Sequence, residues 1–145
     1  MEPNIPPAFW LGIEQFNQRD FYGCHDTLEA LWMDAEQSER TFYQGILQIA
    51  VAFYHMGNDN WKGTVILLGE GVNRLKSYQP SYFGINVEHL LNQSVSILTM
   101  LQQNGPDCIS DLNEKFLQAA NHPDLDLTET SESVSTFPRI VKASD

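Results

Sequence analysis

The chain has 145 residues, of which 42% are hydrophobic and 11% aromatic, and it carries a formal net charge of −11. That length and composition predict one soluble domain, residues 1–145, with a well-filled hydrophobic core. The first sixty residues hold nine acidic residues and only two basic ones. No basic surface is therefore available to neutralise phosphates, and we expect neither nucleic acid nor an anionic membrane as a partner.

Targeting and redox signals point to the cytoplasm. No apolar run reaches the roughly 18 residues that a membrane helix needs, and the N-terminal "MEPNIPPAFW" lacks the basic and apolar regions of a signal peptide. The two cysteines, Cys24 and Cys108, lie far apart and belong to no CxxC pair. We therefore expect an acidic cytoplasmic protein with two free thiols and neither a zinc framework nor a disulfide framework.

Hydrophobic residues recur at helical spacing along the chain, and no segment shows the sustained alternation of a half-buried strand. Asp20, Asn60 and Asn86 each precede such a segment and are typical N-cap residues. The patterns predict an all-α fold without a sheet, with helices over residues 6–18, 21–37, 40–57, 61–77 and 87–104.

The last forty residues have a weaker pattern. A short sixth helix is predicted within "DCISDLNEKFLQAA", and a C-terminal extension follows from about residue 121 to residue 145. This extension is rich in Ser, Thr and acidic residues, and we expect Phe137, Ile140 and Val141 to dock it on the body. The prediction is a single-domain compact helical bundle of five to six helices with an extended C-terminal segment.

The stretch "CHDTLEALW", residues 24–32, contains two polar residues that the helical pattern directs inward. On a helical wheel of about 100° per residue, His25 and Glu29 fall on the same side as Phe21, Leu28 and Trp32. A buried carboxylate costs several kcal/mol unless it is paired. The prediction is therefore that a neighbouring helix supplies polar partners.

The following helix, "RTFYQGILQIAVAFYHMG", is apolar nearly all round and supplies a matching stripe. Gln44, Gln48 and His55 lie within about 40° of one another on its wheel. Packing the two helices together predicts one central polar cluster, formed by His25, Glu29, Gln44, Gln48 and His55.

The same residues carry a resemblance to a known family. The elements FN (Phe16 and Asn17), HxxLExxW (25–32), QGxxQxAxAxxH (44–55) and NxxG (60–63) resemble the family known as domain of unknown function 309. The resemblance covers about residues 9–86, which we take as the family-like core. It implies a compact all-helical fold and supplies no activity, because the family has no known function. The chain differs from the family pattern at Asp26, where a second glutamate is more common.

Three interpretations of the cluster remain open at this point. It can be a purely structural hydrogen-bond network that fixes the register of two helices. It can be the polar part of a small-molecule pocket, with Trp32, Tyr43 and Tyr54 as apolar walls. It can also be a metal site in which His25, Glu29 and His55 are the ligands, a set that suits zinc or non-haem iron.

Two classes of function follow from these interpretations. The first is a protein that binds a small molecule or a metal ion at this cluster, with Tyr54 and Trp32 beside it; whether it also catalyses acid–base chemistry through Glu29 or a histidine stays open, and no cofactor is identified. The alternative is a non-enzymatic protein-interaction module in which the cluster is structural. The helix pair of residues 6–37 resembles a tetratricopeptide unit, and such helical surfaces bind peptides. A protein partner or a homo-oligomer then takes the place of the ligand.

Overall fold

The computed structural model describes residues 5–120 and 137–143. Within these ranges the chain forms six α-helices, two single 3₁₀ turns and one very short hairpin, so the predicted all-α class is confirmed. The helices are α1 (Pro7–Asn17), α2 (Phe21–Asp34), α3 (Gln37–Gly57), α4 (Trp61–Leu75), α5 (Val87–Asn104) and α6 (Ile109–Ala120). The 3₁₀ turns are η1 (Lys76–Tyr78) and η2 (Pro106–Cys108), and the hairpin pairs β1 (Ser81–Tyr82) with β2 (Ile85–Asn86).

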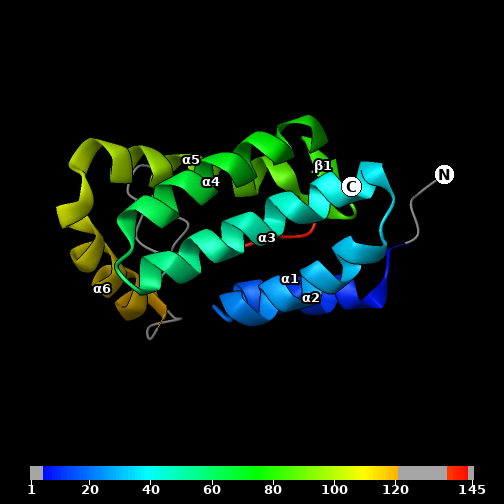
Figure 1. Ribbon diagram of the computed structural model, residues 1–145, viewed down its shortest axis with the longest axis horizontal. Helices are drawn as coiled ribbons and strands as arrows, with labels where there is room; N and C mark the ends of the chain where they lie inside the picture. The colour runs from blue at the N-terminus through cyan, green and yellow to red at the C-terminus, as the bar shows by residue number, and fades with distance from the viewer. Residues whose placement is uncertain (1–4, 121–136, 144–145) are drawn as a thin grey trace.

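Helix α3 is the longest helix and runs through the middle of the bundle (Figure 1). α1 and α2 pack on one side of it and α4 packs on the other, with α5 beyond α4. α6 lies across the end of the bundle where α3 stops, and the Asn113 side chain of α6 donates a hydrogen bond to the carbonyl oxygen of Met56. α3 therefore contacts α2, α4 and α6 and forms the centre of the bundle.

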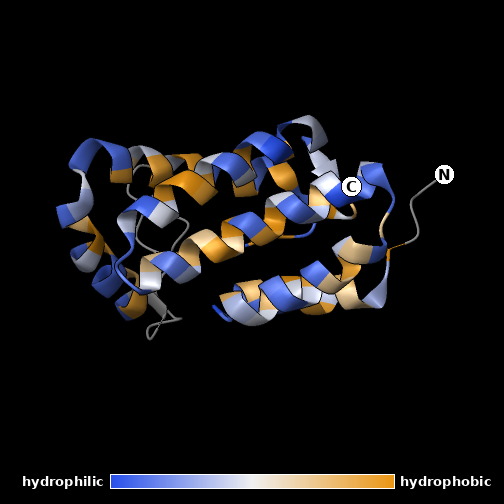
Figure 2. Cartoon of the chain, viewed as in Figure 1, coloured by the Kyte–Doolittle hydropathy of each residue, from blue (hydrophilic) through white to orange (hydrophobic). Residues whose placement is uncertain are grey.

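Hydrophobic residues form stripes along the helices and alternate with hydrophilic ones (Figure 2). The resulting core is rich in aromatic rings: Phe9, Phe42 and Phe83 are all at most 3% exposed, with Phe42 and Phe83 centroids 5.4 Å apart in an edge-to-face arrangement. Aromatic pairs of this geometry add stability beyond the area that they bury.

The three predicted helix caps are confirmed. The side chains of Asp20, Asn60 and Asn86 each accept a hydrogen bond from a backbone N–H three residues further on, at 2.9 to 3.0 Å. The boundary between α2 and α3 differs from the prediction, because Ala35 and Glu36 adopt extended backbone conformations. α2 consequently ends three residues earlier than expected, and α3 begins three residues earlier.

The expectation of no sheet was wrong for a short segment after α4. Phe83 and Gly84 both have positive φ angles, 50° and 75°. Two consecutive residues of this kind form the tight turn that joins antiparallel strands. β1 and β2 therefore pair through Ser81 with Asn86 and Tyr82 with Ile85. The buried Phe83 ring explains why the core holds this unusual turn in place.

Residues 137–143 dock on the body as an extended segment, as predicted. Phe137 and Ile140 are 5% and 3% exposed, whereas Val141 is only half-buried. The remainder of the predicted C-terminal extension, residues 121–136 and 144–145, lies outside the described residues. None of the helices in the described part combines the length and the apolar character that crossing a membrane requires.

Candidate functional site

Helix α2 has a buried face that differs from the one predicted. Its buried side chains are Phe21, Cys24 and Leu28. On the wheel the centre of this set lies about 70° from His25 and about 105° from Glu29. The buried side of α2 is therefore rotated away from the side that the sequence predicted. His25 lies at the edge of the core, and Glu29 lies beyond it.

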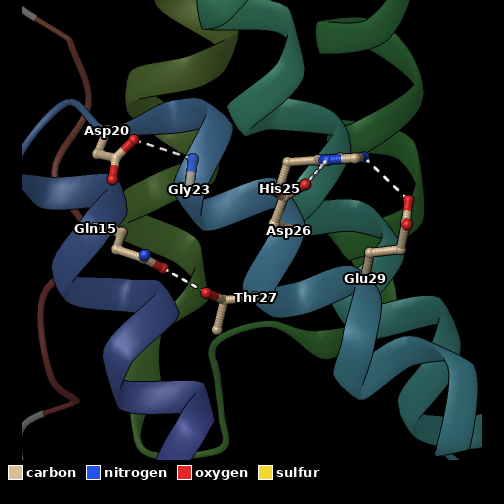
Figure 3. A network of polar contacts seen from close by, with 7 residues as sticks. All are labelled: Gln15, Asp20, Gly23, His25, Asp26, Thr27 and Glu29. Atoms are coloured by element: carbon tan, nitrogen blue, oxygen red, sulfur yellow. Dashed lines mark hydrogen bonds and ion pairs between the residues drawn. The ribbon is translucent and has the colours of Figure 1, made fainter.

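His25 is held at the surface between two carboxylates. Its Nε2 lies 3.3 Å from Oε2 of Glu29, and its Nδ1 lies 3.3 Å from Oδ1 of Asp26 (Figure 3). The three side chains are 26%, 52% and 61% exposed. The predicted burial of Glu29 was therefore wrong, and water solvates the charge that seemed to need a buried partner.

The other side of α2 faces α1. Oγ1 of Thr27 donates a hydrogen bond of 2.7 Å to Oε1 of Gln15, and Figure 3 shows this contact on the side of α2 away from His25 and Glu29. The hydroxyl–amide contact ties the first two helices together. α2 packs on α1 with this side and also on α3, and the side chains of His25 and Glu29 stay partly exposed.

The predicted polar stripe of α3 divides between different neighbours. Gln48 is 8% exposed, and its Oε1 accepts a hydrogen bond of 2.9 Å from Nε of Arg74 in α4. The Nδ1 of His55 lies 3.4 Å from Nδ2 of Asn60, at the turn between α3 and α4. Gln44 is half-buried. In the described part of the chain no hydrogen bond or ion pair joins any of these three residues to His25 or Glu29.

The predicted convergent cluster is therefore corrected. Gln48 accepts a hydrogen bond from Arg74 of α4, a partner that the helical wheel of α3 alone could not reveal. The predicted metal site is corrected as well: among residues 5–120 and 137–143, no three His, Cys, Asp or Glu residues gather closely enough to hold a metal ion. His25 and Glu29 do meet, but His55 does not join them.

Two tyrosines connect the histidines instead. The rings of Tyr22 in α2 and Tyr54 in α3 have centroids 5.6 Å apart. Tyr22 also contacts the imidazole of His25 at 6.3 Å, and Tyr54 neighbours His55 at 6.1 Å. The tyrosines are 59% and 44% exposed. We call the surface formed by Tyr22, His25, Asp26, Glu29, Tyr54 and His55 the α2–α3 face.

The predicted apolar walls have different surroundings. Tyr43 is 1% exposed and packs within the core against Phe9 and Phe42. Trp32 is half-buried, and the guanidinium of Arg40 lies 4.3 Å from the centroid of its ring. Of the three predicted walls, Tyr54 alone belongs to the α2–α3 face. Tyr22, which also belongs to this face, was not among the predicted site residues.

Burial also decides the chemistry of two titratable groups near these helices. It raises the pKa of Cys24 to about 12, and the charge of Asp20 adds to the rise. Burial raises the pKa of Tyr43 to about 12 in the same way, with Glu39 contributing. A thiol with so high a pKa holds its proton at neutral pH and is a poor nucleophile.

A concave region lies between α1 and the C-terminal segment. This cleft has a volume of about 620 Å³. It is lined by Trp10, Ile13, Glu14, Asn17, Gln18, Ile85 and residues 139–142. Asn17, the last residue of α1, binds the backbone of the C-terminal segment.

These helices carry the elements on which the family resemblance rests. Residues 9–67 match the model of a family described as domain of unknown function DUF309. The predicted resemblance is thereby confirmed, over a range that stops short of residue 86. The match covers most of α1, all of α2 and α3 and the first half of α4, and it includes every residue of the α2–α3 face.

One curated relative is similar to part of the chain. The uncharacterised protein YpuF of Bacillus subtilis (strain 168) is 27% identical over 78 residues, which is 53% of this chain. The matched region spans 45% of the relative's own length. Neither comparison names a ligand or an activity, so the geometry has to carry the functional argument.

Proposed function

We propose that this protein is a non-enzymatic protein-interaction module, and that its α2–α3 face binds an arginine- or lysine-bearing segment of a partner protein. The observation that carries the proposal is the contact between Tyr22 and Tyr54, which stays exposed on two adjacent helices. Burying a large aromatic ring usually lowers the free energy, and tyrosines are enriched at protein interfaces.

The surroundings of the tyrosine pair favour a cationic partner. Asp26 and Glu29 flank the imidazole of His25, which contacts the Tyr22 ring, and more than half of each acidic side chain is exposed. Lysine and arginine side chains are attracted to the faces of aromatic rings and to carboxylates. The chain's net charge of −11 adds a long-range attraction for basic segments. Tyr22 and Glu29 thus offer two complementary contacts to one guanidinium.

The arrangement also fits a helical docking surface. Tyr22, His25, Glu29 and Met33 recur at intervals of three and four along α2, so they share one side of this helix. Met33 is 66% exposed, which extends the apolar part of the surface beyond the tyrosines. Flexible methionines suit surfaces that adapt to a partner.

Binding of defined peptides tests the proposal. The ligand is an eight-residue peptide of alternating arginine and alanine, and its control carries citrulline, a neutral isostere, in place of each arginine. We expect the arginine peptide to shift the NMR signals of Tyr22 and Tyr54, and to bind more weakly as salt is added. The citrulline peptide should bind much more weakly. Equal binding of the two peptides would contradict a site for cations.

Variants separate this site from unspecific attraction to an acidic protein. Tyr22→Ala and Tyr54→Ala should each weaken binding about two- to fivefold, which corresponds to one exposed cation–π contact. Leu117→Ala is the matched control, because Leu117 is 60% exposed on α6 and is not one of the residues that form this face. If the tyrosine variants bind like the Leu117 variant, net charge alone explains the binding and the proposal fails.

A further inference from the structure

The extended segment of residues 137–143 is bound along its backbone by three different elements of the body. Asn17 of α1 forms two hydrogen bonds with Ile140: its Nδ2 donates to the carbonyl oxygen at 2.9 Å, and its Oδ1 accepts from the N–H at 2.8 Å. Oε1 of Gln93 in α5 accepts from the N–H of Arg139 at 3.1 Å. The side-chain amides of two helices thus contact the segment as a neighbouring strand would.

The hairpin completes the backbone contacts. The N–H of Asn86 donates to the carbonyl oxygen of Val141 at 2.8 Å, and the N–H of Ala143 donates to the carbonyl oxygen of Gly84 at 2.9 Å. Ile85 and Lys142 form an antiparallel bridge between these two bonds. The segment therefore adds to the edge of the hairpin as a further short strand.

Side-chain pockets fix the register of the segment. The ring of Phe137 lies among those of Phe21, Phe53 and Phe116, with centroid distances of 5.2, 5.4 and 4.8 Å. Pro138 and Ile140 are buried too, whereas the side chains of Arg139 and Lys142 remain exposed. An extended peptide held by main-chain hydrogen bonds, with pockets for some side chains, is a common form of peptide recognition.

An open cleft lies beside the bound segment. The cleft of about 620 Å³ lies between α1 and residues 139–142, with Trp10 and Ile13 on its apolar wall. We call the surface formed by Asn17, the aromatic pocket of Phe21, Phe53 and Phe116, Gly84–Asn86 and Gln93 the tail groove. Space beside a bound peptide leaves room for bulkier side chains than those of this chain's own segment.

Part of the tail groove lies within the family-matched region, whereas the bound segment lies outside it. Asn17, Phe21 and Phe53 lie within the matched residues 9–67, whereas residues 137–143 lie outside them. The α1 clamp and much of the aromatic pocket thus belong to the region that resembles the family. The bound segment belongs to a part of the chain that the match does not reach.

We infer that the tail groove is a peptide-binding groove, occupied here by the chain's own segment and able to bind an extended peptide of a partner protein with an aromatic-proline-x-aliphatic sequence. The segment Phe-Pro-Arg-Ile, residues 137–140, shows the chemistry that fits. The ring enters the aromatic pocket, Asn17 binds the backbone of the aliphatic residue, and the hairpin edge pairs with the residues that follow. A partner peptide binds when it displaces the chain's own segment.

Competition between the two peptides provides the test. The reagent is a fluorescein-labelled, end-capped peptide with the sequence of residues 137–143, and the readout is its fluorescence anisotropy with the full chain. A tethered segment competes at an effective concentration on the order of millimolar, so the wild-type chain should bind the peptide weakly. A full chain with Phe137→Ala and Ile140→Ala should bind it at least about tenfold more tightly.

Two controls define specificity. Adding Asn17→Ala to that variant should abolish the gain, because the backbone clamp is then lost. A peptide in which both Phe and Ile are replaced by Ala should not bind. If the double variant binds the labelled peptide no better than the wild type, the inference is overturned. Exchange of the segment between two copies, seen as a dimer of the wild-type chain, would also overturn it by making a second copy the occupant.

Hydrogen exchange of the wild-type chain gives a second measurement, which is decisive if the double variant does not fold. We expect the amides of Ile140 and Ala143 to exchange at least about tenfold faster than the buried amides in the middle of α3, because the segment detaches without unfolding of the helices. Exchange of both groups at one common rate would mean that the segment leaves only on global unfolding, and would overturn the inference.

Discussion

Asn17 and Ile140 are 123 positions apart in the sequence, yet the Asn17 side chain satisfies both the N–H and the carbonyl oxygen of Ile140. An asparagine amide has one acceptor oxygen and a donor nitrogen, so it can reproduce both bonds that a strand neighbour makes. This single side chain therefore joins the end of α1 to the C-terminal segment.

Replacing Asn17 by alanine should lower the free energy of unfolding by about 1–3 kcal/mol, because a part-buried N–H and a carbonyl oxygen lose their partners. Urea denaturation measures the change, and the Ile140 amide should lose protection in hydrogen exchange. Asn104→Ala is the control, because Asn104 is exposed and its side chain donates a hydrogen bond to Met100 of its own helix. Similar losses in the two variants would show that the clamp contributes little.

Glu29 and Gln48 were predicted to share one buried cluster. In the structure Glu29 is exposed and Gln48 is buried, so the two should contribute differently to stability. Glu29→Ala should change the unfolding free energy by no more than about 0.5 kcal/mol, because its contact with His25 is half-exposed. Gln48→Ala should cost about 1–3 kcal/mol, because it removes a buried acceptor from Arg74. The comparison uses denaturant melts at one pH. A larger cost for Glu29→Ala would restore the original prediction.

The sequence predicted features that depend on a few neighbouring residues. Asp20, Asn60 and Asn86 cap their helices because the cap bond reaches only three residues along the chain. The direction of Glu29 depends instead on which part of α2 meets its neighbours. A rotation of about 100° separates a buried position from an exposed one. Wheels of single helices do not fix that rotation.

Other features depended on distant partners. Gln48 is satisfied by Arg74, 26 positions away and on the next helix, so a polar stripe on α3 alone indicated the wrong neighbour. Asn17 is the last residue of α1, and its partner Ile140 lies near the other end of the chain, where the pattern of α1 alone could not indicate it. The hairpin escaped prediction because each of its strands has only two residues, too few to show alternation.

The raised pKa of Cys24 implies that the protein loses stability at alkaline pH. Its pKa rises from 9.0 to about 12 on folding because the thiol is buried. Between these values the folded chain keeps the proton and the unfolded chain loses it, so the free energy of unfolding falls as pH rises through this window. The expected slope is about 1.4 kcal/mol per pH unit for one such group. Urea melts from pH 8 to pH 11 measure it.

The matched control for this effect is a pair of alanine variants. Cys24→Ala should flatten the dependence on pH, although a smaller fall remains because Tyr43 also has a raised pKa. Cys108→Ala should change the slope less, because Cys108 is only partly buried. An unchanged slope in Cys24→Ala would show that the thiol does not cause the alkaline loss of stability.

Two glycines of α4 distinguish close packing from helix propensity. A Cβ atom on Gly71 would lie 2.8 Å from the carbonyl oxygen of Gly45 and 2.7 Å from Cγ1 of Ile49, both in α3. A Cβ atom on Gly69, two residues earlier, would meet only Cδ2 of Leu98, at 4.0 Å. α3 and α4 therefore approach closely at Gly71, and Gly69 has room for a methyl group.

The same substitution should consequently have opposite effects at these two positions. Gly69→Ala should raise the free energy of unfolding by about 0.5–1 kcal/mol, because alanine favours the helix and restricts the unfolded chain. Gly71→Ala should lower it by about 1–3 kcal/mol, because the backbone of α3 has to move to admit the methyl group. Denaturant melts of both variants against the wild type measure the difference. If both changes stabilise the protein, the contact between α3 and α4 is looser than these distances indicate, because only a backbone that yields easily would let the propensity gain at Gly71 exceed the cost of the clash.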